Sequence, residues 1–144
     1  MRQTESMNRA CDPKSLTAGQ LMQDEVVTCS PRTDGLAIAR LLTERNIGSL
    51  PVVEEGKTLA GLVSEYDLLQ AMIEGRDLRK LTAADLMTRQ VLTVTEDNRL
   101  EDLANLFQDR YVTRLPVVKN NKLVGIVARR DLAFGYMKAV QYWS

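Results

Sequence analysis

The residues best placed to do chemistry lie in the stretch GLVSEYD at positions 61–67. A strand passes there directly into a helix, whose first N–H groups lack partners and therefore attract anions such as phosphate. Ser64 adds a hydroxyl at the same place, and the Asp67 carboxylate can accept two hydrogen bonds from the vicinal hydroxyls of a ribose. These residue types predict a site for a sugar and an anion.

A helix cap accounts for the same two residues without any ligand. Serine at the first position with an acid three residues on forms a capping box, which stabilises a helix by about 1 kcal/mol. The related stretch GIVARRD at positions 125–131 keeps Asp131, although Ala128 has no hydroxyl with which to cap. An acid that is present without its box partner favours a role in binding.

Arginines surround the second of these stretches. Arg129 and Arg130 fall in the first helical turn, where a cation meets the positive end of the helix dipole. A bound anion would remove this conflict, and Arg114 could reach the same site as a bidentate phosphate partner. We expect Arg129 to extend into solvent, while phosphate contact and solvent exposure both remain open for Arg114 and Arg130.

The composition excludes several classes of protein. The 144 residues include 19 Lys and Arg, 19 Asp and Glu, and no His. A neutral balance does not favour binding to nucleic acid or an anionic membrane, and a chain without histidine lacks the commonest general base and metal ligand. We therefore expect neither an enzyme nor a metal site. No apolar run has membrane-spanning length, which predicts a cytoplasmic protein, and Cys11 and Cys29 lie in settings too unlike for a disulfide.

These stretches belong to an internal repeat in which residues 16–68 match residues 81–132 with one single-residue gap. The two copies are identical at 20 of 52 aligned positions, which excludes chance. Each copy predicts a strand (VVTCS or VLTVT), a helix, a hairpin built on LPVV, and a second helix that begins at Ser64 or Ala128. The expected fold is α/β (α+β), with two βαββα repeats packed about a pseudo-two-fold axis, because one copy is too small to bury a core alone.

The sequence divides into three predicted parts. We expect a flexible N-terminal tail over residues 1–15, the first repeat over 16–75, and the second repeat with its linker over 76–144. Amphipathic helices on one side of such a fold leave an apolar surface, so a homodimer is expected.

The repeated LxxxxLM, LPVV and strand-to-helix motifs resemble those of a tandem pair of CBS domains, the module named after cystathionine beta-synthase. The resemblance covers roughly residues 16–140, and every motif occurs twice in register. It implies a two-repeat disc, often called a Bateman module, that binds AMP, ADP, ATP or S-adenosylmethionine in clefts between the repeats.

The resemblance also implies two groups of ligand-binding residues, each drawn from both copies. The first group is Leu62, Ser64, Tyr66 and Asp67 with Thr82, Leu86, Met87, Val112 and Thr113. The second group is Ile126, Arg130, Asp131 and Arg114 with Thr17, Met22, Ile47, Gly48 and Ser49. Asp67 and Asp131 would hold ribose, and Ser64 would hold ribose or phosphate. Ala128 departs from the Ser or Thr usual in this motif, while Arg114 favours the second cleft, so neither cleft is preferred.

The sequence thus predicts a non-enzymatic sensor whose adenosine-containing ligand shifts the pose of the repeats or of a dimer and so regulates an unidentified effector protein. The alternative is a ligand-independent module for dimerisation or protein interaction, with its clefts filled by side chains. An enzyme is the weakest of the three predictions, because Ser64 has no histidine base and no cysteine cluster offers a metal site.

Overall fold

The structure, a computed structural model, describes residues 12–143 of the chain. Cys11 and most of the predicted tail lie outside the described residues. The last three residues of the predicted tail, Pro13–Ser15, form a short 3-10 helix (η1) with Asp12 as its N-cap. The Asp12 side chain accepts a hydrogen bond from the Lys14 N–H at 3.0 Å.

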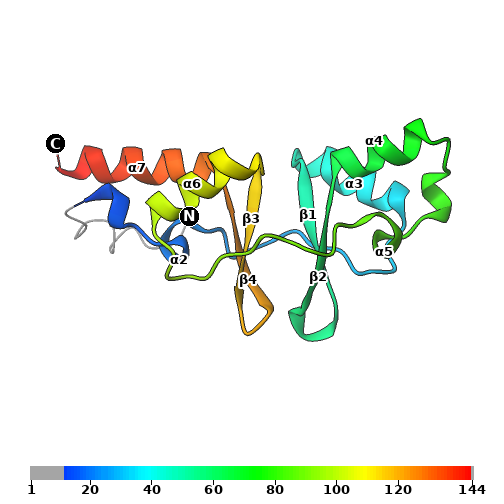
Figure 1. Cartoon of the computed structure of the whole chain (residues 1–144), viewed down its shortest axis with the longest axis horizontal. Helices are drawn as coiled ribbons and strands as arrows, with labels where there is room; N and C mark the ends of the chain where they lie inside the picture. The colour runs from blue at the N-terminus through cyan, green and yellow to red at the C-terminus, as the bar shows by residue number, and fades with distance from the viewer. Residues whose placement is uncertain (1–11, 144) are drawn as a thin grey trace. The chain divides into compact units, whose positions relative to one another are not determined.

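Helices and strands alternate along the described chain, which confirms a mixed α and β fold. The elements in chain order are η1 Pro13–Ser15, α2 Ala18–Leu21, α3 Gly35–Arg45, β1 Ser49–Val53, η2 Glu55–Lys57, β2 Leu59–Ser64, α4 Glu65–Ile73, η3 Leu78–Lys80, α5 Ala83–Leu86, α6 Leu100–Arg110, β3 Arg114–Lys119, β4 Lys122–Ala128 and α7 Arg129–Trp143 (Figure 1). The short helices α2 and α5 had no counterpart in the predicted element order.

The elements form two compact units. The central unit contains residues 27–91, and the terminal unit contains the described residues up to Val26 together with those from Leu92 onward. Residues 16–23 and 81–88, the opening segments of the two repeats, therefore pack with the body of the other repeat. The boundaries of the compact units therefore differ from those of the sequence repeats, because each opening segment belongs to the unit of the other repeat.

Each unit is built on one antiparallel hairpin. Strands β1 and β2 pair in the central unit with Pro51 opposite Leu62, and β3 and β4 pair in the terminal unit with Pro116 opposite Ile126. Asn120 and Asn121 both have positive φ (53° and 63°), which suits the two-residue turn between β3 and β4. Within each unit the two longer helices, α3 and α4 or α6 and α7, lie at the end of the hairpin away from its turn (Figure 1).

The prediction that each repeat opens with a full strand is wrong. Only Cys29 in VVTCS and only Val94 in VLTVT pair with the hairpin, in parallel with Val52 and Val117 respectively. The Cys29 N–H donates to the Pro51 carbonyl at 3.1 Å, and the Cys29 carbonyl accepts from Val53 at 2.8 Å. Turns follow two residues later, at 31–32 and 96–97, and they direct the chain into α3 and α6 before a longer ladder can form.

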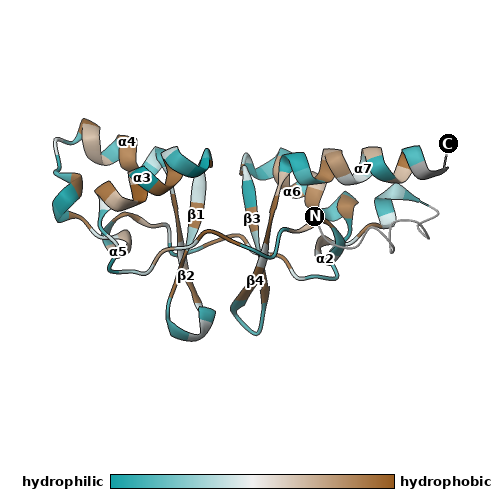
Figure 2. Cartoon of the chain, turned by 180° about the vertical axis from the view of Figure 1, so that it is seen from behind, coloured by the Kyte–Doolittle hydropathy of each residue, from teal (hydrophilic) through white to brown (hydrophobic). Residues whose placement is uncertain are grey.

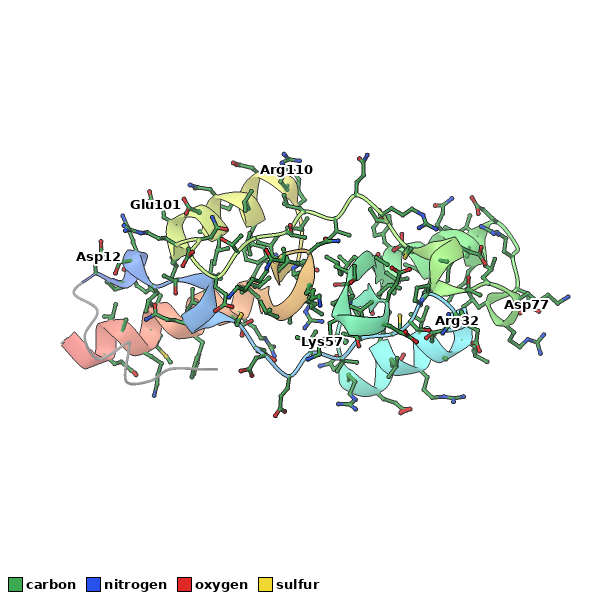
Figure 3. All side chains as sticks on the ribbon, turned by 90° about the horizontal axis from the view of Figure 1, so that it is seen from below. Asp12, Arg32, Lys57, Asp77, Glu101 and Arg110 are labelled. Carbon is green, nitrogen blue, oxygen red and sulfur yellow. The ribbon has the colours of Figure 1, made fainter. Side chains whose placement is uncertain are left out.

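Each unit has its own apolar core. The central core includes Ile38, Leu50 and Val63, and the terminal core includes Leu21, Leu103 and Leu115. Most charged side chains are exposed or partly exposed, and Glu101 and Arg110 on α6 point away from the ribbon in Figure 3. No helix of the described residues has both the length and the apolar character required to cross a bilayer.

Cys29 is part of the central core. Burial raises the pKa of the Cys29 thiol from 9.0 to about 11, although a hydrogen bond with the Thr33 side chain partly opposes this effect. The thiol is therefore protonated near neutral pH, where it is a poor nucleophile.

A methionine from each opening segment packs directly on a glycine of the hairpin. A Cβ atom added at Gly61 would lie 2.6 Å from the Met87 Sδ, and one added at Gly125 would collide with the Met22 Sδ. Met22 is 1% exposed, so this contact is part of the core. The glycine that each repeat shares is therefore required by the side chain of the opening segment that packs against it.

We predict that Gly125→Ala destabilises the protein by about 1 to 3 kcal/mol, because it overpacks the Met22 contact. Chemical denaturation measures the loss. The double variant Gly125→Ala/Met22→Ala should lose less stability than the two single changes summed, because the shortened side chain makes room for the new methyl group. Strictly additive losses would contradict a direct contact between these residues.

Candidate functional site

The strand-to-helix turn of the central unit is closed by Ser64 and Asp67. The Asp67 Oδ2 accepts hydrogen bonds from the Ser64 backbone N–H at 2.8 Å and from the Ser64 hydroxyl at 3.1 Å, and the Asp67 N–H donates to the Ser64 Oγ at 3.3 Å. This is a complete capping box at the start of α4. Both contacts made by the Asp67 carboxylate use Oδ2, so Oδ1 remains available to accept further hydrogen bonds.

The second opening segment lies along the edge of this turn. Leu62 and Thr88 exchange two backbone hydrogen bonds, at 3.0 and 2.9 Å. The same segment places Met87 against Gly61 and buries Leu86. Thr82 is the N-cap of α5 and is hydrogen bonded to Asp85 in a capping box of its own. The central unit therefore places residues of the second repeat beside Leu62 and its neighbours.

The turn of the terminal unit has the same backbone path but different side-chain contacts. The Asp131 Oδ2 accepts from the Ala128 N–H at 2.7 Å, which keeps half of the box, and the Asp131 Oδ1 accepts from the Gln23 Nε2 at 3.1 Å. Gln23 also exchanges two backbone hydrogen bonds with Ile126, both at 2.9 Å. Asp131 is only 6% exposed, and both of its carboxylate oxygens accept hydrogen bonds from the protein.

A cation lies near this buried acid. Arg114 is the first residue of β3 and is paired in register with Ala128. Burial lowers the pKa of the Arg114 guanidinium, and the charge of Asp131 opposes this shift. An arginine nevertheless stays protonated in proteins, so the terminal unit holds a half-buried positive charge beside Asp131. Arg129 and Arg130, in contrast, are exposed.

The structure divides the predicted site residues between the two units. The central unit contains Ile47, Gly48, Ser49, Leu62, Ser64, Tyr66, Asp67, Thr82, Leu86 and Met87. The terminal unit contains Thr17, Met22, Val112, Thr113, Arg114, Ile126, Arg130 and Asp131. Residues 47–49 and 112–113 thus belong to the unit opposite the acid with which they were grouped. The remaining members of each group share a unit with their acid.

Several of these residues already have structural contacts. Met22 and Ile126 are each 1% exposed in the terminal core, and Thr17 caps α2. The Gly48 carbonyl accepts from the Glu65 N–H at 2.9 Å at the start of α4. Tyr66 lies on the open face of α4 and is 81% exposed.

Gln23, which contacts Asp131 directly, was absent from the predicted site. Gln23 follows the Leu-Met pair that occurs in both repeats, and the residue after this pair differs between them: Gln23 in the first repeat and Thr88 in the second. This difference was the one sequence feature that could have pointed to Gln23. The difference could be related to Asp131 only after the structure showed that Gln23 pairs with Ile126.

A pocket of about 450 Å³ also occurs in the terminal unit. It is lined by Phe107, Gln108, Tyr111, Val112 and Arg129, at the end of α6 and the start of α7. Tyr111 ends α6 in the left-handed conformation (φ 55°), where an asparagine occupies the matching position 46 of the first repeat. Of the five lining residues, only Val112 was a predicted site residue.

The side chains at the two turns can bind a ligand through hydrogen bonds and charge. Each turn presents a carboxylate at a helix start, with a hydroxyl in the central unit and a guanidinium in the terminal unit. Across residues 12–143 no group of three or more Cys, Asp or Glu side chains is arranged to hold a metal ion. Carboxylate acceptors with nearby donors suit a polar ligand that carries hydroxyls and an anionic group.

Comparison with known sequences identifies a family and several relatives. The CBS domain family matches residues 18–74 and 83–137. The CBS domain-containing protein YhcV of Bacillus subtilis is 35% identical over 117 residues, which cover 81% of this chain and 82% of that protein. Some relatives are longer, and the chain spans 62% of the protein MK0525 of Methanopyrus kandleri, with 33% identity.

Solved structures share the fold. CBSX2, known from Arabidopsis thaliana, has been solved in complex with AMP; it has a TM-score of 0.75 and 30% identity, over 85% of this chain and 97% of that chain. The CBS domain pair of protein MJ0100 has been solved with 5′-methylthioadenosine and S-adenosyl-L-methionine. It has a TM-score of 0.73 and 26% identity, over 82% of this chain and 93% of that chain.

The two turns provide a matched pair of stability tests. We predict that Ser64→Ala lowers the free energy of unfolding by about 1 kcal/mol, because it removes the hydroxyl of the α4 capping box. Ala128→Ser should raise it by up to about the same amount, because it completes the box around Asp131. Urea denaturation at neutral pH measures both. A neutral Ser64→Ala variant combined with a destabilised Ala128→Ser variant would contradict the capping geometry.

Proposed function

The chain belongs to the CBS domain family, and we propose that it is a regulatory module that binds adenosine-containing ligands without transforming them. The observation that carries this proposal is the duplicated strand-to-helix turn, with Asp67 in one unit and Asp131 in the other. Relatives with this fold bind AMP, 5′-methylthioadenosine and S-adenosylmethionine. The candidate ligands for this chain are AMP, ADP, ATP and S-adenosylmethionine.

Each proposed contact follows from the chemistry of its side chain. A carboxylate that accepts two hydrogen bonds matches the vicinal hydroxyls of ribose, which assigns that role to Asp67 and Asp131. The Ser64 hydroxyl and the first N–H groups of α4 match ribose or phosphate. Arg114 and Arg130 supply the positive charge for a phosphate on the terminal unit.

A regulatory role requires that the ligand bind two states of the protein with different affinity. The ligand then shifts the population of those states by its differential affinity alone, with no bond made or broken. One relative of this chain is an L-aspartate semialdehyde sulfurtransferase from Methanocaldococcus jannaschii, but the match covers only 20% of that protein.

We predict that AMP, ADP, ATP or S-adenosylmethionine raises the melting temperature of the purified protein. A ligand at one hundred times its dissociation constant adds about 2.7 kcal/mol of stability, which corresponds to a rise of several degrees in a thermal-shift assay. The variant Asp67→Ala/Asp131→Ala should show no rise, whereas Glu74→Ala, which alters an exposed acid after α4, should respond like the parent. Calorimetric titrations without heat for all four ligands would overturn the proposal.

Exposed apolar side chains favour a second function, association with another copy of this chain. On α4 these side chains are Leu69, Met72 and Ile73, and Ile73 is 80% exposed. The helix α7 exposes Tyr136 and Met137 at the repeat positions that match Met72 and Ile73. Figure 2 shows brown, hydrophobic stretches on both α4 and α7. We propose a homodimer formed through these helices, because an interface with two-fold symmetry brings an apolar patch against its own copy.

The dimer prediction is tested with Ile73→Lys and Met137→Lys. Each change places a charge among the exposed apolar side chains of its helix, so we expect the dissociation constant of the dimer to rise by about tenfold or more. Light scattering after size-exclusion chromatography, performed over a range of concentrations, measures this constant. Gln70→Lys, which adds the same charge at another exposed position of α4, is the matched control. A parent protein that is monomeric at all concentrations would exclude the dimer.

A further inference from the structure

We propose that the two ribose-binding turns are not equivalent: Asp67 of the central unit is the high-affinity acceptor, and Gln23 lowers the affinity of the turn around Asp131. This inference rests on the proposed function and adds which turn binds and which residue makes the difference. The two turns share a backbone path, so their inequality comes from the side chains that surround each acid.

In the terminal unit the protein itself supplies the hydrogen bonds that a ribose would supply. The Gln23 Nε2 donates to the Asp131 Oδ1 at 3.1 Å, and the Ala128 N–H donates to the Asp131 Oδ2 at 2.7 Å. The carboxylate is 6% exposed, and the positive charge of Arg114 lies near it. A ribose hydroxyl that binds Asp131 must first displace the Gln23 amide and reach a buried oxygen.

In the central unit the equivalent acid is more accessible. The two hydrogen bonds that its carboxylate accepts from Ser64 both use Oδ2, and Asp67 is partly exposed. Thr88 takes the place of Gln23 and keeps the same backbone pairing, with Leu62. A threonine side chain is shorter than that of glutamine, and in the described chain it forms no hydrogen bond with Asp67. The Asp67 Oδ1 is thus available to a ribose without displacement of a protein donor.

The opening segments therefore set the ligand preference of the turns on which they pack. Gln23 and Thr88 hold matching positions and pair with the matching strand residues Ile126 and Leu62, but only the Gln23 side chain is hydrogen bonded to the acid of its unit. A side-chain hydrogen bond to a charged acceptor is strong enough to change an affinity by about tenfold when a ligand must break it. Placing threonine at position 23 and glutamine at position 88 should therefore raise the ligand affinity of the turn around Asp131 and lower that of the turn around Asp67.

Isothermal titration with AMP tests the inference on the full-length protein and four variants: Asp67→Asn, Asp131→Asn, Gln23→Thr and Thr88→Gln. We expect one high-affinity AMP per parent chain, retained in Asp131→Asn and lost in Asp67→Asn. Thr88→Gln should weaken that binding by about tenfold, and Gln23→Thr should tighten a second, weaker event by about tenfold. The melting temperature of each variant without ligand checks that it is folded.

The possible failures are distinguishable. Two equal AMP sites in the parent, or loss of high-affinity binding in Asp131→Asn with retention in Asp67→Asn, would overturn the inference and leave the proposed function intact. Unchanged AMP affinity in both Thr88→Gln and Gln23→Thr would remove Gln23 as the cause. A parent protein that binds neither AMP nor S-adenosylmethionine would overturn the proposed function and this inference together.

Discussion

Each hairpin of this protein is held in place by single-residue pairings along both of its edges. Cys29 bonds to β1 on one side of the central hairpin, and Thr88 bonds to β2 on the other. Val94 and Gln23 do the same for β3 and β4. A two-stranded hairpin is marginal alone in water, so these pairings and the core beneath them decide whether either unit forms. The contact of a methionine with a glycine beside each edge fixes how closely the opening segment can approach.

The opening segments contribute both to the stability of each unit and to the proposed ligand binding. Each opening segment closes one strand edge, and it also pairs Gln23 or Thr88 with the strand that leads into the turn with the acid. Substitutions in these segments can therefore change what the turn binds while the backbone pairing stays the same. The difference between Gln23 and Thr88 is of this kind, because both residues make the same backbone contacts and only one reaches the acid with its side chain.

The two acids also combine two roles. Asp67 and Asp131 both accept a hydrogen bond from the backbone N–H of the residue just before their helix, and this contact stabilises α4 and α7 without a ligand. A carboxylate has two oxygens, so capping and ligand recognition are compatible when one oxygen remains available. Asp67 satisfies this condition, whereas both oxygens of Asp131 are already hydrogen bonded.

The sequence by itself determined the repeat, the hairpins, the helix that begins at Ser64 and the two acids, because each depends on local chemistry: capping, turn residues and the spacing of apolar side chains. It did not determine that VVTCS and VLTVT pair through one residue each, because their extent depends on turns that compete with the ladder. Only the tertiary structure decided which opening segment packs on which hairpin. Contacts such as that of Gln23 with Asp131 join residues 108 positions apart, and no local pattern encodes a contact at that separation.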